Sequence, residues 1–200
     1  MVSYARLTPM TPDEFLAWEA EQELKWEFDG FQPVAMTGGT RAHSVIQANL
    51  LSTLVSRLNE GPCQAYGSDL KVQTGQSYRY PDVSVSCTQF PDNEILVAEP
   101  VVVFEVLSAS TAGDDRTIKA AEYKSLRSLR RYVMLEQDRV FATVLTRTAT
   151  GWDHSLVGLD GTLAMPEIGV EVPLATLYRG LALTAPAPAD APEPPQSAVS

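Results

Sequence analysis

The segment PVVVFEVLSAS, residues 100–110, limits the fold more than any other part of this 200-residue chain. Its apolar residues do not alternate with polar ones, which is the pattern of a strand covered on both faces. Glu105 interrupts the run. An ionised carboxylate away from water costs several kcal/mol unless it is paired or binds a metal. The segment therefore predicts a central buried strand in which Glu105 has a partner.

A second acid, Asp82, opens another strand candidate in RYPDVSVSC. Two acidic residues on adjacent central strands are a recurrent way to hold a hard cation such as Mg²⁺ through oxygen ligands. Such an ion polarises a phosphoryl oxygen and lowers the pKa of a bound water. Asp82 alone is weak support, because Pro-Asp also opens turns. Together with Glu105, it makes a metal site and a purely structural role comparable hypotheses.

A lysine usually completes this chemistry by offsetting the negative charge of the phosphorane that forms when water attacks a phosphate. Leu107, two positions after Glu105, cannot do so, and the next candidates are Lys119 and Lys124 on the helix expected to follow. At 100° per residue, Lys119 lies within about 60° of Tyr123 and Leu126, on a face that Ile118, Glu122 and Leu129 extend. Lys124 points about 140° away, toward solvent. We expect Lys119 to point inward, the alternative being a surface lysine whose stem covers apolar residues.

Two further polar residues have weaker signals. His43 precedes an apolar helical stripe made of Ile46, Leu50, Leu54 and Leu58. A lone histidine on such a face is more often structural than catalytic. Glu27 lies between Trp26 and Phe28 in a strand candidate, so we expect it to face opposite to those aromatic side chains. Neither residue predicts a function by itself.

The order of elements predicts an α/β or α+β protein with a mixed sheet flanked by helices. We expect helices at 11–21, 41–61 and 114–129, a hairpin around Asp29-Gly30 within 24–36, a last helical turn at 173–178, and strands at 63–72, 80–87, 101–107, 132–136, 140–147 and 152–157. Thr11, Pro12 and Glu14 form an N-terminal capping signature. Residues 1–183 are expected to form a single domain, and the Pro/Ala-rich tail 184–200 is expected to be disordered.

The formal net charge of −10 and a pI near 4.6 oppose nucleic-acid binding. Six of the fifteen basic residues nevertheless fall within sixteen positions. This run is either a solvated helix face or the place where a polyanion docks: Arg116, Lys119, Lys124, Arg127, Arg130 and Arg131.

The chain shows no signal-peptide pattern and no apolar run near the roughly 20 residues that span a bilayer. Cys63 and Cys87 lie in different strand candidates and form neither a CxxC pair nor a disulfide framework. We therefore expect a cytoplasmic protein without membrane contact, in which both cysteines are buried free thiols.

Together these motifs resemble the Uma-type (Uma2) restriction endonuclease family of the PD-(D/E)XK nuclease superfamily. The resemblance covers nearly the whole folded region. It is carried by MTPDEFLAW, WEFDG, RAHSVIQANL, RYPDVSV, VVVFEVLSAST, DDRTIKAAEYKSLRSLRRYVMLE and GTLAMPEIGVEVPLATLY. It implies a restriction-endonuclease-like core and an active-site lysine that has moved from the strand to the following helix.

The resemblance also implies roles for six residues. Asp82 and Glu105 would be ligands of Mg²⁺ or Mn²⁺, and Lys119 the charge-stabilising residue. Supporting roles would fall to Glu27 and His43 near the metal and to Tyr123 beside the lysine. Small nucleases of this superfamily often act as homodimers, so a homodimer is also implied.

Three functional hypotheses remain. The first is a metal-dependent endonuclease that hydrolyses phosphodiester bonds, with DNA as the substrate by analogy. The second is a catalytically silent module that binds a protein or nucleic acid on a nuclease scaffold, which the acidic charge favours. The third is a metal-dependent hydrolase of a smaller phosphoester.

Overall fold

A computed structural model describes residues 9–36, 38–108, 113 and 115–183. The helices are α1 (Pro12–Glu19), α2 (Arg41–Leu58), α4 (Ala120–Ser125) and α5 (Leu174–Leu177), with a π-helical turn at Asp115–Lys119 and a 3₁₀ turn at Pro166–Ile168. The strands are β1 (Trp26–Phe28), β2 (Pro33–Ala35), β3 (Gln64–Gly67), β4 (Val72–Thr74), β5 (Ser77–Arg79), β6 (Val83–Ser86), β7 (Pro100–Leu107), β8 (Arg131–Glu136), β9 (Ala142–Arg147), β10 (Trp152–Val157), β11 (Thr162–Met165) and β12 (Val170–Pro173).

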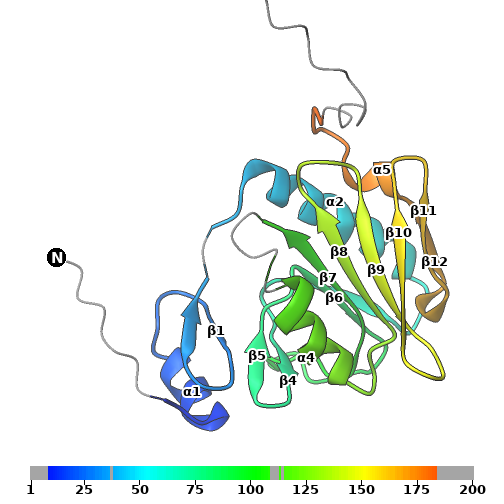
Figure 1. Ribbon diagram of the computed structural model, residues 1–200. Helices are drawn as coiled ribbons and strands as arrows, with labels where there is room; N and C mark the ends of the chain where they lie inside the picture. Colours follow the sequence, from blue (N-terminus) through cyan, green and yellow to red (C-terminus); the bar gives the residue numbers. More distant parts are fainter. Residues whose placement is uncertain (1–8, 37, 109–112, 114, 184–200) are drawn as a thin grey trace, which may run out of the picture.

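The largest sheet has six strands in the order β10-β9-β8-β7-β6-β3. The β7–β8 pair is parallel and its other neighbours are antiparallel, so the sheet is mixed, as predicted. Helix α2 packs on one face and α4 on the other (Figure 1). A parallel pair needs a crossover connection, and the segment with the π-helical turn and α4 supplies it.

Strand β7 lies in the centre of this sheet and contributes to two hydrophobic clusters. Val102, Phe104 and Val106 belong to the cluster that contains the α2 stripe. Val103 and Leu107 belong to the opposite cluster, with Tyr123 of α4. Because side chains alternate along a strand, Glu105 stands between Val103 and Leu107 on the α4 face.

A second sheet, β2-β1-β5-β4, lies beside the first. The predicted hairpin around Asp29-Gly30 is confirmed, with Glu27 opposite Val34. Gly30 has a φ of +90°, a conformation that favours glycine. The predicted capping box of α1 is also present. Helix α1 packs on this sheet through a stack of Phe15 on Phe28, with ring centroids 4.9 Å apart.

Some element predictions were wrong in extent. The helix expected at 114–129 begins as a π-helical turn and ends at Ser125, because Leu126 is extended with φ −67° and ψ 123°. Asp114 lies outside the described residues. The strand expected at 63–72 is split between β3 and β4, which belong to different sheets. The β11–β12 hairpin was not predicted.

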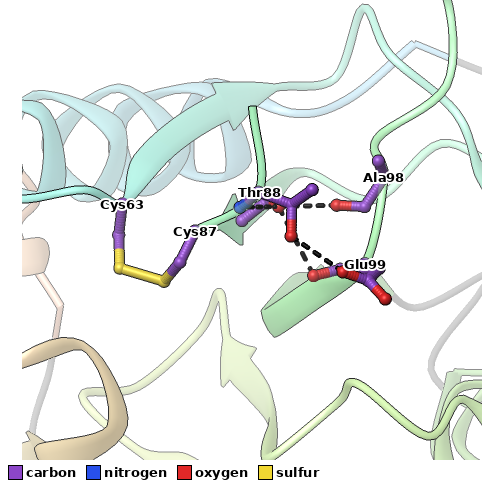
Figure 2. Close-up of a disulfide and its surroundings, with 6 residues drawn as sticks. Cys63, Cys87, Thr88, Ala98 and Glu99 are labelled. Atoms are coloured by element: carbon purple, nitrogen blue, oxygen red, sulfur yellow. Dashed lines mark hydrogen bonds between the residues drawn. A yellow bond between two sulfur atoms is a disulfide. The ribbon is translucent and has the colours of Figure 1, made fainter. Parts of the chain in front are cut away.

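The prediction of free thiols was also wrong: Cys63 and Cys87 form a disulfide (Figure 2). Cys63 directly precedes β3 and Cys87 directly follows β6. These strands pair antiparallel with Gln64 opposite Ser86, so their register brings the two cysteines together. Both cysteines are partly buried. Sequence spacing alone could not show that β3 and β6 are neighbours.

Two other predictions concern the ends and the membrane. The tail 184–200, predicted to be disordered, lies outside the described residues. Among the residues that are described, no helix combines the length and apolarity needed to cross a bilayer.

Candidate active site

Asp82 and Glu105 reach one region from adjacent strands. Asp82 directly precedes β6, and Val83 pairs with Phe104 of β7, which places Asp82 beside Glu105 in the ladder. The Oδ2 atom of Asp82 accepts a 2.6 Å hydrogen bond from the backbone N–H of Val106. Both residues are buried, 8% and 5% exposed. The register thus brings the two acids predicted from the sequence together.

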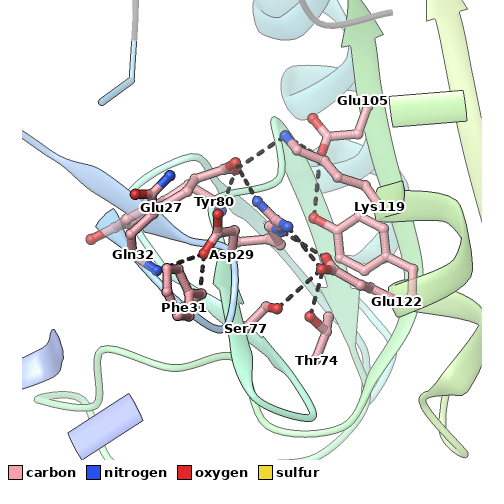
Figure 3. A network of polar contacts seen from close by, with 12 residues as sticks. Glu27, Asp29, Phe31, Gln32, Thr74, Ser77, Tyr80, Glu105, Lys119 and Glu122 are labelled. Carbon is pink, nitrogen blue, oxygen red and sulfur yellow. Dashed lines mark hydrogen bonds and ion pairs between the residues drawn. The ribbon is translucent and has the colours of Figure 1, made fainter. Parts of the chain in front are cut away.

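Lys119 points inward, as its helical angle predicts. Its Nζ atom lies 3.1 Å from Oε1 of Glu27 and 3.6 Å from Oε1 of Glu105 (Figure 3). The neighbouring Ile118 was expected on the same face but is 53% exposed. The π-helical turn that ends at Lys119 widens the helix here, so angles of 100° per residue do not hold across it.

Tyr123 lies one turn beyond Lys119 and is completely buried. Its hydroxyl donates a 3.1 Å hydrogen bond to Oε1 of Glu105. Burial, followed by the negative charges of Glu105 and Glu27, raises the pKa of Tyr123 well above its usual value. The phenol therefore keeps its proton and remains a donor to Glu105.

His43 lies in the first turn of α2, which Thr40 caps through its side chain. The Nε2 atom of His43 is 3.2 Å from Oδ1 of Asp82. Gly39 packs against the imidazole so closely that a β-carbon there would lie 3.0 Å from the ring. His43 is thus held directly against one of the two acids.

Glu27 is buried and accepts three hydrogen bonds. Its Oε1 atom accepts hydrogen bonds from Nζ of Lys119 and from the backbone N–H of Tyr80, both at 3.1 Å. Its Oε2 atom accepts one from Nη1 of Arg79 at 3.2 Å. Arg79 in turn binds both carboxylate oxygens of Glu122, at 2.7 and 2.8 Å. The sequence signals missed Arg79 altogether, and they placed Glu122 inward without a partner.

These side chains line a cavity of about 570 Å³ that opens to solvent. Its polar wall contains Glu27, His43, Arg79, Asp82, Glu105 and Lys119. Among the described residues, this lining contains four carboxylates, Glu27, Asp29, Asp82 and Glu105, and the two cations Arg79 and Lys119. Glu122, which binds Arg79, adds a fifth carboxylate outside the lining. Formal negative charge therefore exceeds positive charge among these described residues, and a divalent cation would offset part of it.

The ligand chemistry also limits which metal fits. Among the described residues, no group of three or more His, Cys, Asp or Glu side chains is arranged to hold a metal ion. Mg²⁺ usually binds through one or two carboxylates and completes its octahedron with water and substrate oxygens. The pair of Asp82 and Glu105 fits that requirement.

A family model described as "Putative restriction endonuclease", Uma2, matches residues 12–176. The chain belongs to the Uma2 family. Among curated proteins, it is 33% identical over 195 residues to the uncharacterized protein slr1290 of Synechocystis sp. strain PCC 6803, covering 91% of this chain and 100% of that one. It is 29% identical over 142 residues to the uncharacterized protein sll1609 of the same strain, covering 68% of this chain and 80% of that one.

The fold of this Uma2 protein also occurs in a solved structure. A crystal structure described as a "putative nuclease belonging to DUF820" from Anabaena variabilis ATCC 29413 superposes with a TM-score of 0.71. The match covers 85% of this chain and 98% of that one, at 19% identity. The nuclease-like fold expected from the sequence is therefore confirmed.

The basic run of this Uma2 protein is not one surface. Arg131 is 8% exposed and binds both oxygens of Glu167, at 2.6 and 3.0 Å, so its predicted role in docking a polyanion was wrong. Arg116 pairs with Glu136 at 2.6 Å, at the end of the sheet where β7 finishes. Arg127 and Arg130 are exposed at the other end, and the backbone N–H of Arg130 bonds Val101, four residues before Glu105.

Proposed function

We propose that this protein is a metal-dependent endonuclease that hydrolyses phosphodiester bonds in DNA. The single observation that carries the proposal is that Asp82, Glu105 and Lys119 converge on one open cavity. Burying carboxylates costs several kcal/mol unless their charge is offset, so two buried acids beside a lysine in such a cavity are a candidate cation site. Membership of a family described as restriction endonucleases supports the phosphodiester substrate.

Asp82 and Glu105 would hold Mg²⁺ or Mn²⁺. When bound there, the ion would supply a Lewis acid for a phosphoryl oxygen and lower the pKa of water. Val106 fixes Asp82 through its backbone N–H, and Tyr123 fixes Glu105 through its hydroxyl. These hydrogen bonds restrict both carboxylates before a cation binds, which would favour binding.

Lys119 would offset the negative charge that develops on the phosphate as water attacks in line. Its ammonium group contacts Glu105 and so stands beside the place where the phosphate would bind. His43 would orient Asp82, to which it lies within hydrogen-bond distance. Glu27 would hold Lys119 from the other side.

We also propose that the protein acts as a homodimer, since cleavage of both strands of a duplex needs two sites or two binding events. Light scattering on the purified chain decides it: a mass of two chains supports the dimer, and a mass of 21.8 kDa contradicts it.

The experiment that tests the function combines Mn²⁺ titration calorimetry with plasmid nicking. Wild type, Asp82→Asn and Glu105→Gln are compared, with Asp153→Asn on β10, an exposed residue outside the cavity lining, as the control. We expect wild type and Asp153→Asn to bind Mn²⁺ and nick DNA, and the two site variants to do neither.

Other outcomes redirect the proposal. Binding of Mn²⁺ without nicking of any DNA would favour hydrolysis of a smaller phosphoester, which a chromogenic phosphodiester would then reveal. If wild type neither binds Mn²⁺ nor cleaves, the proposal is contradicted. The formal charge of −10 would then favour the catalytically silent module.

A further inference from the structure

Arg79 connects the small sheet to the helix that carries Lys119. It is the last residue of β5, and its side chain is 6% exposed. The Nε and Nη2 atoms bind both oxygens of Glu122 on α4, while Nη1 binds Oε2 of Glu27 on β1. One guanidinium group thus binds two carboxylates from two different elements.

These contacts close a ring. Glu122 follows Lys119 by three residues, and the Lys119 ammonium group returns to Glu27, which Arg79 also binds. Ser77 adds a 3.0 Å hydrogen bond to Glu122. A lysine side chain has four rotatable carbon–carbon bonds, so an isolated Lys119 would sample many positions. The ring restricts its Nζ atom to the space between Glu27 and Glu105.

The chemistry of the ring requires arginine. The planar guanidinium group presents five donors in a fixed fork, and it can bind one carboxylate with two atoms while a third atom binds another. Burial alone would lower the pKa of Arg79, but the hydrogen bonds to Glu122 and the charge of Glu27 outweigh it and raise the pKa. The group is therefore permanently charged.

We propose that Arg79, together with Glu122, is a positioning residue for Lys119 and acts through Glu27. The inference rests on the proposed nuclease function. In that reaction Arg79 sets where the ammonium group of Lys119 stands and has no contact with the scissile phosphate. Neither the Uma2 description nor the sequence motifs assign a role to this pair.

The competing account is that Arg79 merely ties α4 to the small sheet. Arg131 provides a matched control, because it is also buried and also binds two oxygens of one carboxylate, Glu167. It lies outside the cavity lining. Loss of either arginine leaves a carboxylate without its partner, so both substitutions should lower stability by a similar mechanism.

The test compares Arg79→Gln with Arg131→Gln in the full chain, using plasmid nicking with Mn²⁺. For Arg79→Gln we expect kcat to fall by roughly 10- to 100-fold, the range seen when a supporting residue is lost, with KM and Mn²⁺ affinity retained. For Arg131→Gln we expect kcat to be unchanged below its melting temperature. Arg79→Lys keeps the positive charge, and it replaces Arg79→Gln in this comparison if Arg79→Gln does not fold. It should also have a lowered kcat, because one ammonium nitrogen cannot reproduce the planar fork in which three guanidinium nitrogens bind Glu122 and Glu27.

A second readout does not depend on activity. Slowly exchanging lysine ammonium groups give ¹⁵N signals, and Lys119→Met assigns that of Lys119. We expect Arg79→Gln to shift or broaden this signal and Arg131→Gln to leave it. Unchanged kcat together with an unchanged signal in Arg79→Gln would overturn the inference. If wild type does not cleave DNA but its Lys119 signal changes in Arg79→Gln, the nuclease proposal is overturned. The positioning role of Arg79 is then still supported.

Discussion

A buried lysine, Lys71, and a partly buried one, Lys119, have opposite surroundings in this protein. Lys71 pairs with one carboxylate, Glu19, at 2.9 Å, and its Nζ atom lies 5.2 Å from the centre of the Tyr80 ring. Lys119 stands between two carboxylates, Glu27 and Glu105. Lys71 is outside the cavity lining, whereas Lys119 is part of it.

The two regions meet at Tyr80. Its hydroxyl donates to Glu19 at 2.8 Å, and its backbone N–H donates to Glu27 at 3.1 Å. On the Lys71 side the charges cancel and the polar groups are satisfied by one another. On the Lys119 side, the described carboxylates outnumber the described cations beside an open cavity. Burial of charge therefore does not distinguish the two regions, whereas contact with an open cavity does.

The largest expected effect on stability is that of Lys71→Met. Removing one partner of a buried ion pair leaves Glu19 uncompensated and costs about 3–5 kcal/mol. We expect urea unfolding to show this loss, while nicking by the folded fraction is unchanged. The double variant Lys71→Met/Glu19→Leu should recover most of it, since an apolar pair replaces the ion pair. Reduced nicking in that double variant would contradict the division between the two regions.

Lys119→Met tests the other lysine. Loss of one group that stabilises transition-state charge lowers the rate by about 10²- to 10³-fold, and we expect a loss of that size in plasmid nicking. Lys124→Met, five positions along the chain, is the matched control and should nick as wild type does. Equal losses in both variants would show that the effect comes from the helix rather than from the ammonium group.

The disulfide should affect stability and leave the chemistry unchanged. Cys63 and Cys87 are 24 residues apart, and closing a loop of this size stabilises by about 3 kcal/mol in the chain-entropy account. We expect Cys63→Ser/Cys87→Ser, or wild type in reductant, to unfold at a lower urea concentration. The nicking rate per folded molecule should stay the same as in untreated wild type. Unchanged stability in reductant would mean that the cysteines are not joined in solution.

Tyr123→Phe should have the smallest effect. It removes one buried hydrogen bond to Glu105, worth about 1 kcal/mol, and should lower the nicking rate less than Lys119→Met does. Because the folded-state pKa of Tyr123 is raised, its contribution to stability is complete below about pH 10 and is lost as the pH rises toward that folded-state value. Above about pH 10, the free energy of unfolding measured with urea should therefore fall less steeply with pH in Tyr123→Phe than in wild type.

Part of the site could be predicted from local patterns. Glu105 stands out because it interrupts an apolar strand, and the helical angle separates Lys119 from Lys124. Both signals arise within one element, where periodicity fixes which way a side chain points. Their roles in catalysis stay predictions.

The rest depends on contacts between distant parts of the chain. Arg79 and Glu122 are 43 residues apart, and Lys71 and Glu19 are 52 apart, so no local pattern connects them. The disulfide was missed for the same reason, because the neighbours of a strand follow from the topology of the sheet. The basic run is continuous in sequence, but Arg131 begins β8 and is buried against Glu167, whereas Arg130 just before it is exposed.

The central proposal, that Asp82 and Glu105 beside Lys119 bind a divalent cation, is tested most directly by thermal unfolding with and without Mn²⁺. A ligand at 100 times its Kd stabilises by about 2.7 kcal/mol, so Mn²⁺ should raise the Tm of wild type. Glu19→Gln should have a lower Tm and keep the response to Mn²⁺. Glu105→Gln should be at least as stable as wild type without metal and lose the response. A wild-type Tm that Mn²⁺ leaves unchanged at every concentration would contradict the account.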